Sequence, residues 1–463
     1  MKDEISFDTE KRERLEYHIT EMMRRNRVYG LSILITMDDR VLYSRGFGLR
    51  SANPPMPATP DTLYGIGSST KIFTALSILK LVEMSRIRLD DPVDMYIKGL
   101  RTDLKGHPVT IHQLLSHTSG FPDLGMASVT LGHPLGEQDV WTPLGSIDDL
   151  VTLINGARDE RVSEKGDVFM YWNEGYVLLS RVIEDSSGMG YPDFVKKNIL
   201  SPLGMKRSTF DLQDFENDDD IMVGYYSSED NRKVPQRFPY HPLGHGDGGL
   251  ISSVSEMGHM VGMMMNGGLW KGRRIIGRKY LDIAMTPKVD VNFPAERGKR
   301  ISYGYGIVID DNFFRHVKFG HGGNVAVSSS YFGFIPDLKA AVVVASNSDF
   351  GVYSIADYAL SLSIGKDPEK LPAIEFQRKA DLLIGRYETY KGSAKMQISL
   401  KGPNLFMEIG HPGQSNPMPL TIDGDNLFMM VGHNKVKLDV DIRPQGIVDI
   451  RFDRLVFHRV GKL

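Results

Sequence analysis

Residues 65–87 read GIGSSTKIFTALSILKLVEMSRI, and the rest of the fold must be built around this stretch. Apolar residues recur in it at helical spacing: Ile72, Leu76, Leu79 and Val82. The spacing predicts a helix from Ser68 to about Ile87, and because apolar side chains occupy nearly every side of it, we expect the helix to be buried. Gly65 and Gly67 suit a tight turn into its first residue.

Ser68 and Lys71 begin that helix and are the first candidates for chemistry. Positions three apart share a helix face, so the two side chains can meet. A serine hydroxyl is a weak nucleophile until a base removes its proton, and a lysine serves as that base where burial or nearby positive charge favours its neutral form. The helix N-terminus also stabilises negative charge that develops near Ser68. The pair therefore predicts a nucleophile and its base.

The Ser-x-x-Lys spacing occurs twice more, at Ser77/Lys80 and at Ser363/Lys366. We interpret both copies as structural, since a mid-helix hydroxyl such as that of Ser77 bonds to the preceding turn and Ser363 lies at a predicted helix end. For Ser68 itself the alternative is a helix N-cap, for which serine is a preferred residue. The spacing alone leaves that alternative open.

A second motif, Tyr171-Trp172-Asn173, stands just before another predicted helix. A tyrosine held beside a lysine ammonium can relay protons between a nucleophile and a leaving group. Asn173 suits contacts to Lys71 and to a substrate amide. The alternative interpretation is a core tyrosine followed by an N-capping asparagine.

The third motif, FGHGGN at residues 319–324, leads into a predicted strand. Its glycines, Gly322 and Gly323, allow a substrate to approach the strand edge, where backbone N–H groups can bind an oxyanion. The alternative is a glycine-rich turn, and a turn is also our interpretation of the second His-x-Gly, at residues 411–413.

We expect the oxyanion hole to consist of the backbone N–H groups of Ser68 and Asn324. His321 would line the same site and supply a positive or a hydrogen-bonding group.

Strand patterns occur near both ends of the first three quarters of the chain, over residues 31–37, 41–49, 302–310, 325–336 and 340–347. Helices are predicted over residues 8–27 and 352–364, and residues 100–300 mix short helices with Gly/Pro-rich loops that we expect to wall a cleft. Strands at both ends around a mostly helical middle predict a mixed α/β (α+β) fold. In it an antiparallel sheet is flanked by helices and joined to a helical subdomain.

Beyond residue 372 the pattern changes to short alternating strands. Apolar and polar residues alternate along one of them, with Val436, Leu438, Val440 and Ile442 as the apolar set. Roughly six to eight such strands at regular spacing predict a small antiparallel β-barrel or sandwich. We therefore predict two domains, residues 1–372 and residues 373–463, of which the second is all-β.

The composition is that of an ordinary globular protein. The 463 residues are 41% hydrophobic and 24% charged, and a net charge of −3 gives no reason to expect a nucleic-acid partner. Because the chain has no cysteine, disulfides, cysteine nucleophiles and thiolate metal sites are excluded. We expect neither a metal ion nor an organic cofactor.

The N-terminal 27 residues are densely charged and lack the apolar segment of a signal peptide. No apolar run approaches the roughly 18 residues of a membrane span. The sequence therefore predicts a cytoplasmic protein without a membrane partner.

The three motifs, in this order, resemble the serine β-lactamase and penicillin-binding-protein superfamily. The branch is that of class C β-lactamases, D-aminopeptidases, D,D-carboxypeptidases and related esterases. The resemblance covers about residues 10–365 and includes five longer stretches, at residues 59–83, 89–97, 109–123, 175–205 and 248–264.

The resemblance implies that Ser68 is the acylated serine, Lys71 its base, Tyr171 the proton shuttle and Asn173 a contact to the lysine and the substrate. The third motif of true lactamases and transpeptidases usually begins with lysine, whereas His321 resembles the esterase and D-aminopeptidase variants. This difference implies weak or absent β-lactamase activity.

Similar proteins sometimes carry C-terminal barrels of lipocalin type, which cover the cleft or mediate oligomerisation. We therefore expect a homo-oligomer formed through the C-terminal domain.

The expected activity is hydrolysis of an amide, peptide or ester bond through an acyl-Ser68 intermediate. A peptidase, including one for peptides that contain D-residues, and an esterase both fit. The alternative is a binding or scaffold protein that keeps this fold with little or no turnover. The intact set of motif residues favours the enzyme.

Overall fold

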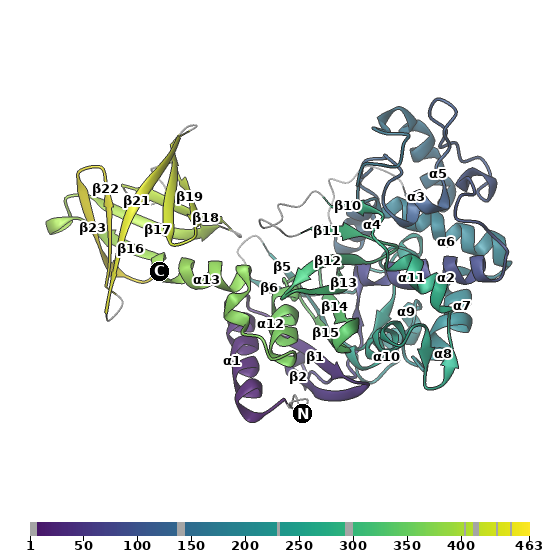
Figure 1. Ribbon diagram of the computed structural model, residues 1–463, viewed down its shortest axis with the longest axis horizontal. Coiled ribbons are helices and arrows are strands. Elements are labelled where there is room, and N and C mark those ends of the chain that lie inside the picture. The colour runs from purple at the N-terminus through teal and green to yellow at the C-terminus, as the bar shows by residue number, and fades with distance from the viewer. Residues whose placement is uncertain are drawn as a thin grey trace. The chain divides into compact units, whose positions relative to one another are not determined.

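Strands from both ends of the larger unit meet in one antiparallel sheet of nine strands, in the order β10-β11-β12-β13-β14-β15-β1-β2-β3 (Figure 1). The strands are β1 (Gly30–Met37), β2 (Arg40–Ala52), β3 (Pro55–Pro57), β10 (Val289–Asp290), β11 (Ile301–Tyr303), β12 (Val308–Phe313), β13 (His316–Asn324), β14 (Ser329–Ile335) and β15 (Ala340–Ser346). The computed structural model describes residues 7–136, 144–228, 232–291, 300–401, 404–410, 416–431, 434–444 and 447–463. The chain divides into two units, Met1–Lys366 and Asp367–Leu463.

The centre of the sheet joins the two ends of the larger unit. β1 pairs with β15 from Leu31↔Ser346 to Met37↔Ala340 and with β2 on its other side. The helices α1 (Thr9–Arg25) and α12 (Tyr353–Ser363) pack together on one face of the sheet, and α10 (Val254–Met265) packs on the other (Figure 1). The predicted sheet flanked by helices is thus confirmed.

The predicted helical middle lies between β3 and β10 and includes α2 (Lys71–Glu83), α3 (Ile111–Leu115), α4 (Met126–Leu135), α5 (Ile147–Gly156), α6 (Asn173–Ser187), α7 (Tyr191–Val195), α8 (Ser201–Leu203), α9 (Leu212–Glu216) and α11 (Arg278–Ala284). Three short strand pairs accompany them: β4 (Tyr64–Gly65) with β7 (Ile251–Ser252), β5 (Gly224–Ser227) with β6 (Lys233–Gln236), and β8 (Leu269–Trp270) with β9 (Arg273–Arg274).

The buried helix predicted from Ser68 to Ile87 is shorter than expected. Ser68 lies in a 3₁₀ turn, η1 (Gly67–Thr70), and α2 ends at Glu83. Shortly after that end Ser85 has a φ of +58°, a left-handed backbone that an α-helix cannot contain. The buried character of α2 is as predicted, since nearly all of its side chains are buried, Lys71 included.

The strand predicted over residues 302–310 is two strands, β11 and β12, separated by a turn. Gly306 in that turn has a φ of +68°, and a Cβ there would lie 2.7 Å from the carbonyl oxygen of Lys71. The strand breaks where its backbone turns against the start of α2, a contact that no alternating pattern reveals.

The second unit contains a closed barrel, which confirms the predicted C-terminal barrel. The helix α13 (Pro372–Leu383) precedes it within the predicted second domain, so that domain is not all-β. The barrel strands are β16 (Gly385–Glu388), β17 (Lys395–Lys401), β18 (Asn404–Ile409), β19 (Met418–Asp423), β20 (Asn426–Val431), β21 (Asn434–Arg443), β22 (Ile447–Phe452) and β23 (Leu455–Gly461). The boundary predicted at residue 372 falls at the start of α13, within the unit that begins at Asp367.

The alternation along β21 is only partly a core pattern. Leu438 is buried in the barrel, whereas Ile442, near the end of the strand, is 48% exposed. Alternation places a side chain on the inward face, but only the length of the barrel decides whether that side chain is covered.

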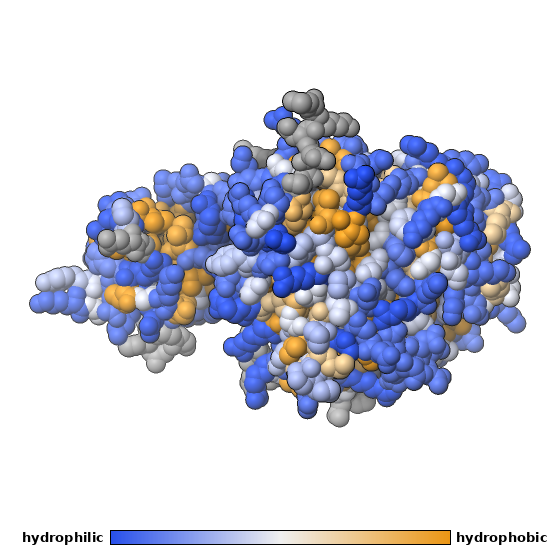
Figure 2. Space-filling view, turned by 90° about the horizontal axis from the view of Figure 1, so that it is seen from below, coloured by the Kyte–Doolittle hydropathy of each residue, from blue (hydrophilic) through white to orange (hydrophobic). Residues whose placement is uncertain are grey.

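Hydrophilic residues cover most of the molecular face in Figure 2, with apolar patches between them. No helix in the described part of the chain combines the length and apolar character needed to cross a bilayer.

Candidate active site

Ser68 stands in the 3₁₀ turn between β4 and α2, against the end of β13. The N-cap interpretation of Ser68 is wrong, because the capping positions are Ile66 for the turn and Thr70 for α2. Gly67 has a φ of +52°, and a Cβ there would lie 2.4 Å from the backbone nitrogen of Asn324. Only glycine lets the two segments approach this closely.

The buried Lys71 ammonium directs its hydrogen bonds at three oxygen atoms. Lys71 Nζ donates to Ser68 Oγ (3.1 Å), Asn173 Oδ1 (2.8 Å) and the carbonyl oxygen of Asp247 (2.9 Å). The amide and carbonyl oxygens can only accept, whereas a hydroxyl can accept or donate. A neutral Lys71 therefore keeps two donated bonds and turns its lone pair to the Ser68 hydroxyl, which is the arrangement that a general base needs.

Tyr171 and Asn173 both reach this lysine. Lys71 Nζ lies 4.9 Å from the centroid of the Tyr171 ring. Asn173 is the first residue of α6, whose capping position is Trp172, so Asn173 does not cap the helix. Its Oδ1 accepts from Lys71, and Asn173 lines a cavity together with Ser68.

His117 holds the segment that carries Tyr171. The backbone N–H of Trp172 donates to His117 Nδ1 (3.0 Å), and Met170 N–H donates to the His117 carbonyl (2.8 Å). The His117 and Tyr171 rings lie 4.2 Å apart between centroids. Burial, with the nearby Lys71 charge, holds the pKa of His117 well below its usual value, so the imidazole is neutral. His117 is thus a positioning residue.

His321 lies on β13 and is 5% exposed. Its Nδ1 lies 2.6 Å from the Gly322 carbonyl, to which it donates, and its Nε2 accepts from the Tyr303 hydroxyl at 3.0 Å. Burial, reinforced by the charge of Lys71, lowers the pKa of His321 to about 4. At neutral pH the side chain is therefore a hydrogen-bonding group and not a cation.

The glycines of β13 bring the strand end against Ser68. A Cβ on Gly323 would lie 1.8 Å from the Ile66 carbonyl and 2.8 Å from the backbone nitrogen of Ser68. The side chain of Asn324 donates to Asp349, and its backbone nitrogen lies beside Gly67, the residue before Ser68. The two N–H groups expected to form the oxyanion hole lie on these opposed segments.

Two cavities meet at this point, and Ser68 and Asn324 line both of them. The smaller cavity, of about 100 Å³, is also lined by Asn173, Asp247 and His241. The larger cavity, of about 550 Å³, is lined mainly by aromatic, aliphatic and glycine residues, among them Phe169, Tyr171, Tyr303, His321, Gly322, Gly323, Phe350 and Tyr353.

The other motif copies behave as their local sequence suggests. The Ser77 hydroxyl donates to the Phe73 carbonyl (2.8 Å), and Ser363 donates to the Leu360 carbonyl (2.7 Å). Both are structural, as predicted. Residues 411–413 lie outside the described residues.

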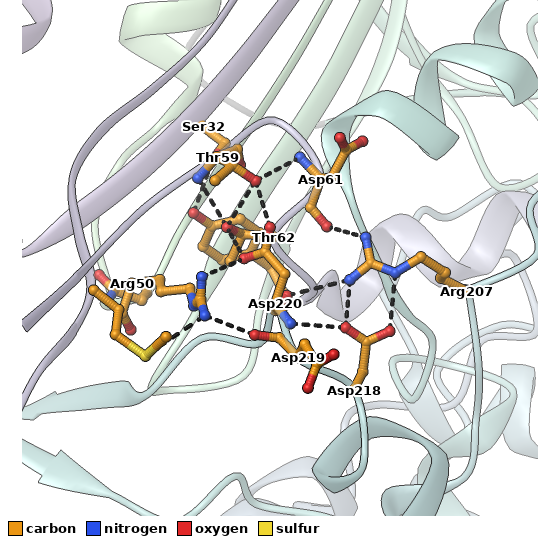
Figure 3. Close-up of polar contacts among 12 residues, drawn as sticks. Ser32, Arg50, Thr59, Asp61, Thr62, Arg207, Asp218, Asp219 and Asp220 are labelled. Atoms are coloured by element: carbon orange, nitrogen blue, oxygen red, sulfur yellow. Dashed lines mark hydrogen bonds and ion pairs between the residues drawn. The ribbon is translucent and has the colours of Figure 1, made fainter. Parts of the chain in front are cut away.

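A polar network braces the chain just before the Ser68 turn (Figure 3). Asp220 accepts from the hydroxyls of Thr59 (2.5 Å) and Thr62 (2.6 Å) and pairs with Arg50 at 3.1 Å. Its carbonyl also accepts from the backbone N–H of the residue after Thr62 (2.8 Å). The approach to Ser68 is thereby anchored to a strand and to a distant loop, which favours a preorganised nucleophile.

Three residues of the site were missed by the sequence reasoning: His117, Tyr303 and Asp247. The local sequence around His117 and Tyr303 contains no pattern that indicates a functional residue. Only their buried hydrogen bonds show that they belong to the site. The Gly248-Gly249 pair after Asp247 is the one local signal, since glycines mark close backbone approach.

Within the described residues, no group of three or more histidine, aspartate and glutamate side chains is arranged to hold a metal ion. The prediction that neither metal nor cofactor takes part stays a prediction.

Residues 15–366 match the Beta-lactamase family, and residues 368–458 match the Pab87 octamerisation domain. The octameric penicillin-binding protein homologue from Pyrococcus abyssi is 36% identical in sequence. Its structure superimposes with a TM-score of 0.89 over 96% of this chain and 99% of that one.

Penicillin-binding protein 4* of Bacillus subtilis is 26% identical over 399 residues, which cover 82% of this chain and 83% of that protein. Protein flp of Staphylococcus aureus is 28% identical over 246 residues in one strain, covering 53% of this chain and 47% of flp. In others it is 24% identical over 327 residues, or 61% of flp. The chain thus spans about half to three fifths of these flp proteins. A D-stereospecific amidohydrolase from Streptomyces, 22% identical with a TM-score of 0.58 over 73% of this chain and 94% of that one, shares the fold.

Proposed function

Since this chain belongs to the β-lactamase family, we propose that it is a serine hydrolase that cleaves amide, peptide or ester bonds through an acyl-Ser68 intermediate. The observation that carries the proposal is the 3.1 Å contact between Lys71 Nζ and Ser68 Oγ at the junction of two cavities. A buried lysine beside a serine that lines a cavity has the geometry of a base beside its nucleophile.

In the first step Ser68 Oγ attacks the substrate carbonyl carbon while its proton passes to Lys71. The developing oxyanion is bound by the N–H groups of Ser68 and Asn324. As the intermediate collapses, the bond to the leaving group breaks, and the leaving group receives the proton from Lys71 through Tyr171. Water then attacks the acyl-Ser68 ester by the reverse proton path and releases the acid.

We propose that β-lactamase activity is weak or absent. The larger cavity, on the Tyr171 side, has no lysine or arginine among its described lining residues, and it does contain the carboxylate of Asp349. His321 is neutral there. The carboxylate of a penicillin or cephalosporin would find no cationic partner, so neutral amides and esters suit this cavity better.

The rival proposal is a binding or scaffold protein of the same fold. The experiment that separates the two is intact-mass analysis after incubation with a p-nitrophenyl ester. We expect an adduct on the wild type and none on Ser68→Ala. Ser77→Ala is the matched control, because it removes a serine with the same spacing to a lysine, and it should still be acylated. No wild-type adduct, or an equal adduct on Ser68→Ala, would support the scaffold.

We further propose that the chain assembles with copies of itself through the unit Asp367–Leu463. The match to an octamerisation domain and the octameric homologue support this proposal. Three neighbouring barrel strands also expose apolar side chains, namely Ile442, Ile447, Val456 and Val460, which are 42–58% exposed.

Light scattering tests the assembly. A multimer of the wild type and a smaller species for the double variant Val456→Lys/Val460→Lys are expected. Val41→Lys, an exposed valine of the first unit, should leave the mass unchanged. A wild-type monomer at micromolar concentration would contradict the proposal.

A further inference from the structure

Glu174 is a buried carboxylate that follows directly on Asn173, the residue whose Oδ1 accepts from Lys71. The side chain of Glu174 is fully buried. Its Oε1 accepts from the backbone N–H groups of Leu124 and Met126, both at 3.1 Å. Its Oε2 is buried without a hydrogen-bond partner among the described residues. The acyl transfer proposed above gives this carboxylate no part.

The ionised form of Glu174 lowers the stability of the fold. Desolvation by burial raises the pKa of Glu174 to about 7, and the negative charge of Asp123 acts in the same direction. The hydrogen bonds from backbone N–H groups oppose the shift without cancelling it. Folding therefore favours the protonated acid, and stability is lost as the pH rises from the unfolded value towards 7. A buried acid that destabilises the fold is more common at functional positions than in an ordinary core.

The two N–H groups that Glu174 binds lie at and just before the start of α4, which walls the smaller cavity. Three residues of α4 line that cavity beside Ser68: Ala127, Thr130 and Leu131. The far end of the helix is tied separately, since Gln236 Nε2 donates to the Leu135 carbonyl at 3.4 Å. The position of the near end therefore depends on Glu174.

We propose that Glu174 is a positioning residue that fixes α4 against α6 and thereby limits the size of the acyl group that the smaller cavity accepts. The inference rests on the proposed acyl-Ser68 chemistry and names what sets its acyl preference. A leaving group that takes its proton through Tyr171 lies in the larger cavity, which Tyr171 lines, so the acyl group occupies the smaller one. A fixed cavity of about 100 Å³ suits a short acyl chain.

The hold on α4 depends on the charge of the carboxylate. An ionised Oε1 makes charge-assisted hydrogen bonds, which are roughly twice as strong as neutral ones. A proton added at Oε2 would lack an acceptor in the present geometry, which favours a turn of the Glu174 side chain away from Leu124 and Met126. Acid pH should therefore release the start of α4 and let the smaller cavity admit longer acyl chains.

Other titratable groups surround the start of α6. They are Lys71 of α2, His117 after α3, Asp123 before α4, and His245 and Asp247 at the end of the 3₁₀ turn η5 (Pro242–His245). Burial holds the pKa of His117 well below its usual value and that of His245 at about 4, so both are neutral above pH 6. Burial raises the pKa of Asp247 to about 6, so a variant must separate its titration from that of Glu174.

The test is the ratio of kcat/KM for p-nitrophenyl acetate to kcat/KM for p-nitrophenyl hexanoate, measured across the pH range around 7. The leaving group is the same in both esters, so the titration of Lys71 cancels from the ratio. On the wild type we expect the ratio to rise about fivefold from acid to alkaline pH, the effect of about one hydrogen bond, with a midpoint near pH 7. Glu174→Gln keeps an acceptor for the two N–H groups but cannot ionise, so its ratio should not change with pH.

Glu184→Gln is the matched control, because Glu184 also accepts from a backbone N–H, that of Tyr191 at 3.1 Å, but near the other end of α6. It should leave the ratio and its pH dependence unchanged. Asp123→Asn removes the charge that raises the pKa of Glu174 and keeps an acceptor for Gly125. It should move the midpoint to lower pH.

A wild-type ratio that does not change with pH would overturn the inference while acylation of Ser68 still stood. An equal pH dependence in Glu174→Gln would overturn it as well, and would assign the effect to Asp247 or His241, which line the smaller cavity. No acylation of Ser68 by either ester would overturn the proposed function instead. The wild-type and Asp123→Asn curves need no change at Glu174, so they decide the matter even if Glu174→Gln does not fold.

Discussion

The two cavities that meet at Ser68 differ in size and in the residues that line them, although Ser68 and Asn324 line both. The smaller one is lined by Asp247, whose Oδ1 is buried without a hydrogen-bond partner among the described residues, and by Asn173. The larger one is lined mainly by aromatic, aliphatic and glycine residues together with the carboxylate of Asp349, and its histidine is neutral. The contrast teaches that the two sides of Ser68 differ in room and in the share of aromatic and aliphatic lining, although each is lined by one aspartate.

Replacing Lys71, the proposed base, should slow the reaction equally for substrates that occupy either cavity, and it gives the largest expected effect. For Lys71→Ala we expect kcat/KM to fall by about 10³–10⁴-fold on every substrate, because Lys71 Nζ is the group that the described structure places within hydrogen-bond distance of Ser68 Oγ. Stopped-flow acylation with a p-nitrophenyl ester measures it. Lys80→Ala alters the lysine of the second Ser-x-x-Lys pair, which bonds to Glu83, and should stay within a fewfold of wild type. A small loss of kcat/KM for Lys71→Ala would contradict the proposal that Lys71 is the base for substrates in both cavities.

Tyr171→Phe probes the leaving-group side alone. We expect a loss of about 10²-fold on anilides, whose leaving group needs a proton, and less than tenfold on p-nitrophenyl esters, whose leaving group does not. Steady-state kcat/KM for an anilide and ester pair with the same acyl group gives the ratio. Equal losses on both would show that Tyr171 acts on the nucleophile and not through the larger cavity.

Asp247→Asn should stabilise the protein at pH 8 by up to about 2 kcal/mol. The folded pKa of about 6 lies above the ordinary aspartate value, so folding favours the protonated acid, and the ionised carboxylate costs stability above pH 6. That cost disappears as the pH falls to about 4. Thermal unfolding at pH 8 and pH 4 should therefore show a higher Tm for the variant only at pH 8. An equal rise in Tm at pH 8 and at pH 4 would contradict the conclusion that the ionised Asp247 carboxylate is buried.

His321→Lys should give the smallest effect, by placing a cation in the apolar cavity. We expect acylation by a penicillin to rise about tenfold, which corresponds to one charge-assisted hydrogen bond to its carboxylate. His321→Gln supplies a hydrogen bond without the charge and should not show the rise. Fluorescent penicillin labelling rates compare the three proteins, and an equal rise with glutamine would refute the electrostatic explanation.

Local pattern was enough for much of the fold. Ser68 and Lys71 meet because three residues make one turn, so the spacing itself predicts their contact. The two other serines with the same spacing to a lysine, Ser77 and Ser363, had to be excluded separately. The barrel followed in the same way from alternation with a period of two. The extent of elements was less predictable: α2 ends early at a left-handed Ser85, and β11 and β12 separate where Gly306 contacts Lys71.

Residue types and their order in the sequence suffice to single out the candidates for the chemistry, Ser68, Lys71, Tyr171 and Asn173. Only the tertiary structure decided what surrounds them. Lys71 contacts Asn173 and Asp247, which lie 102 and 176 positions further along the sequence. His321 is neutral because side chains from other elements bury it. Spacing specifies contacts within a turn or a strand. Charge state and cavity shape depend instead on desolvation, a sum over side chains that become neighbours only when the chain has folded.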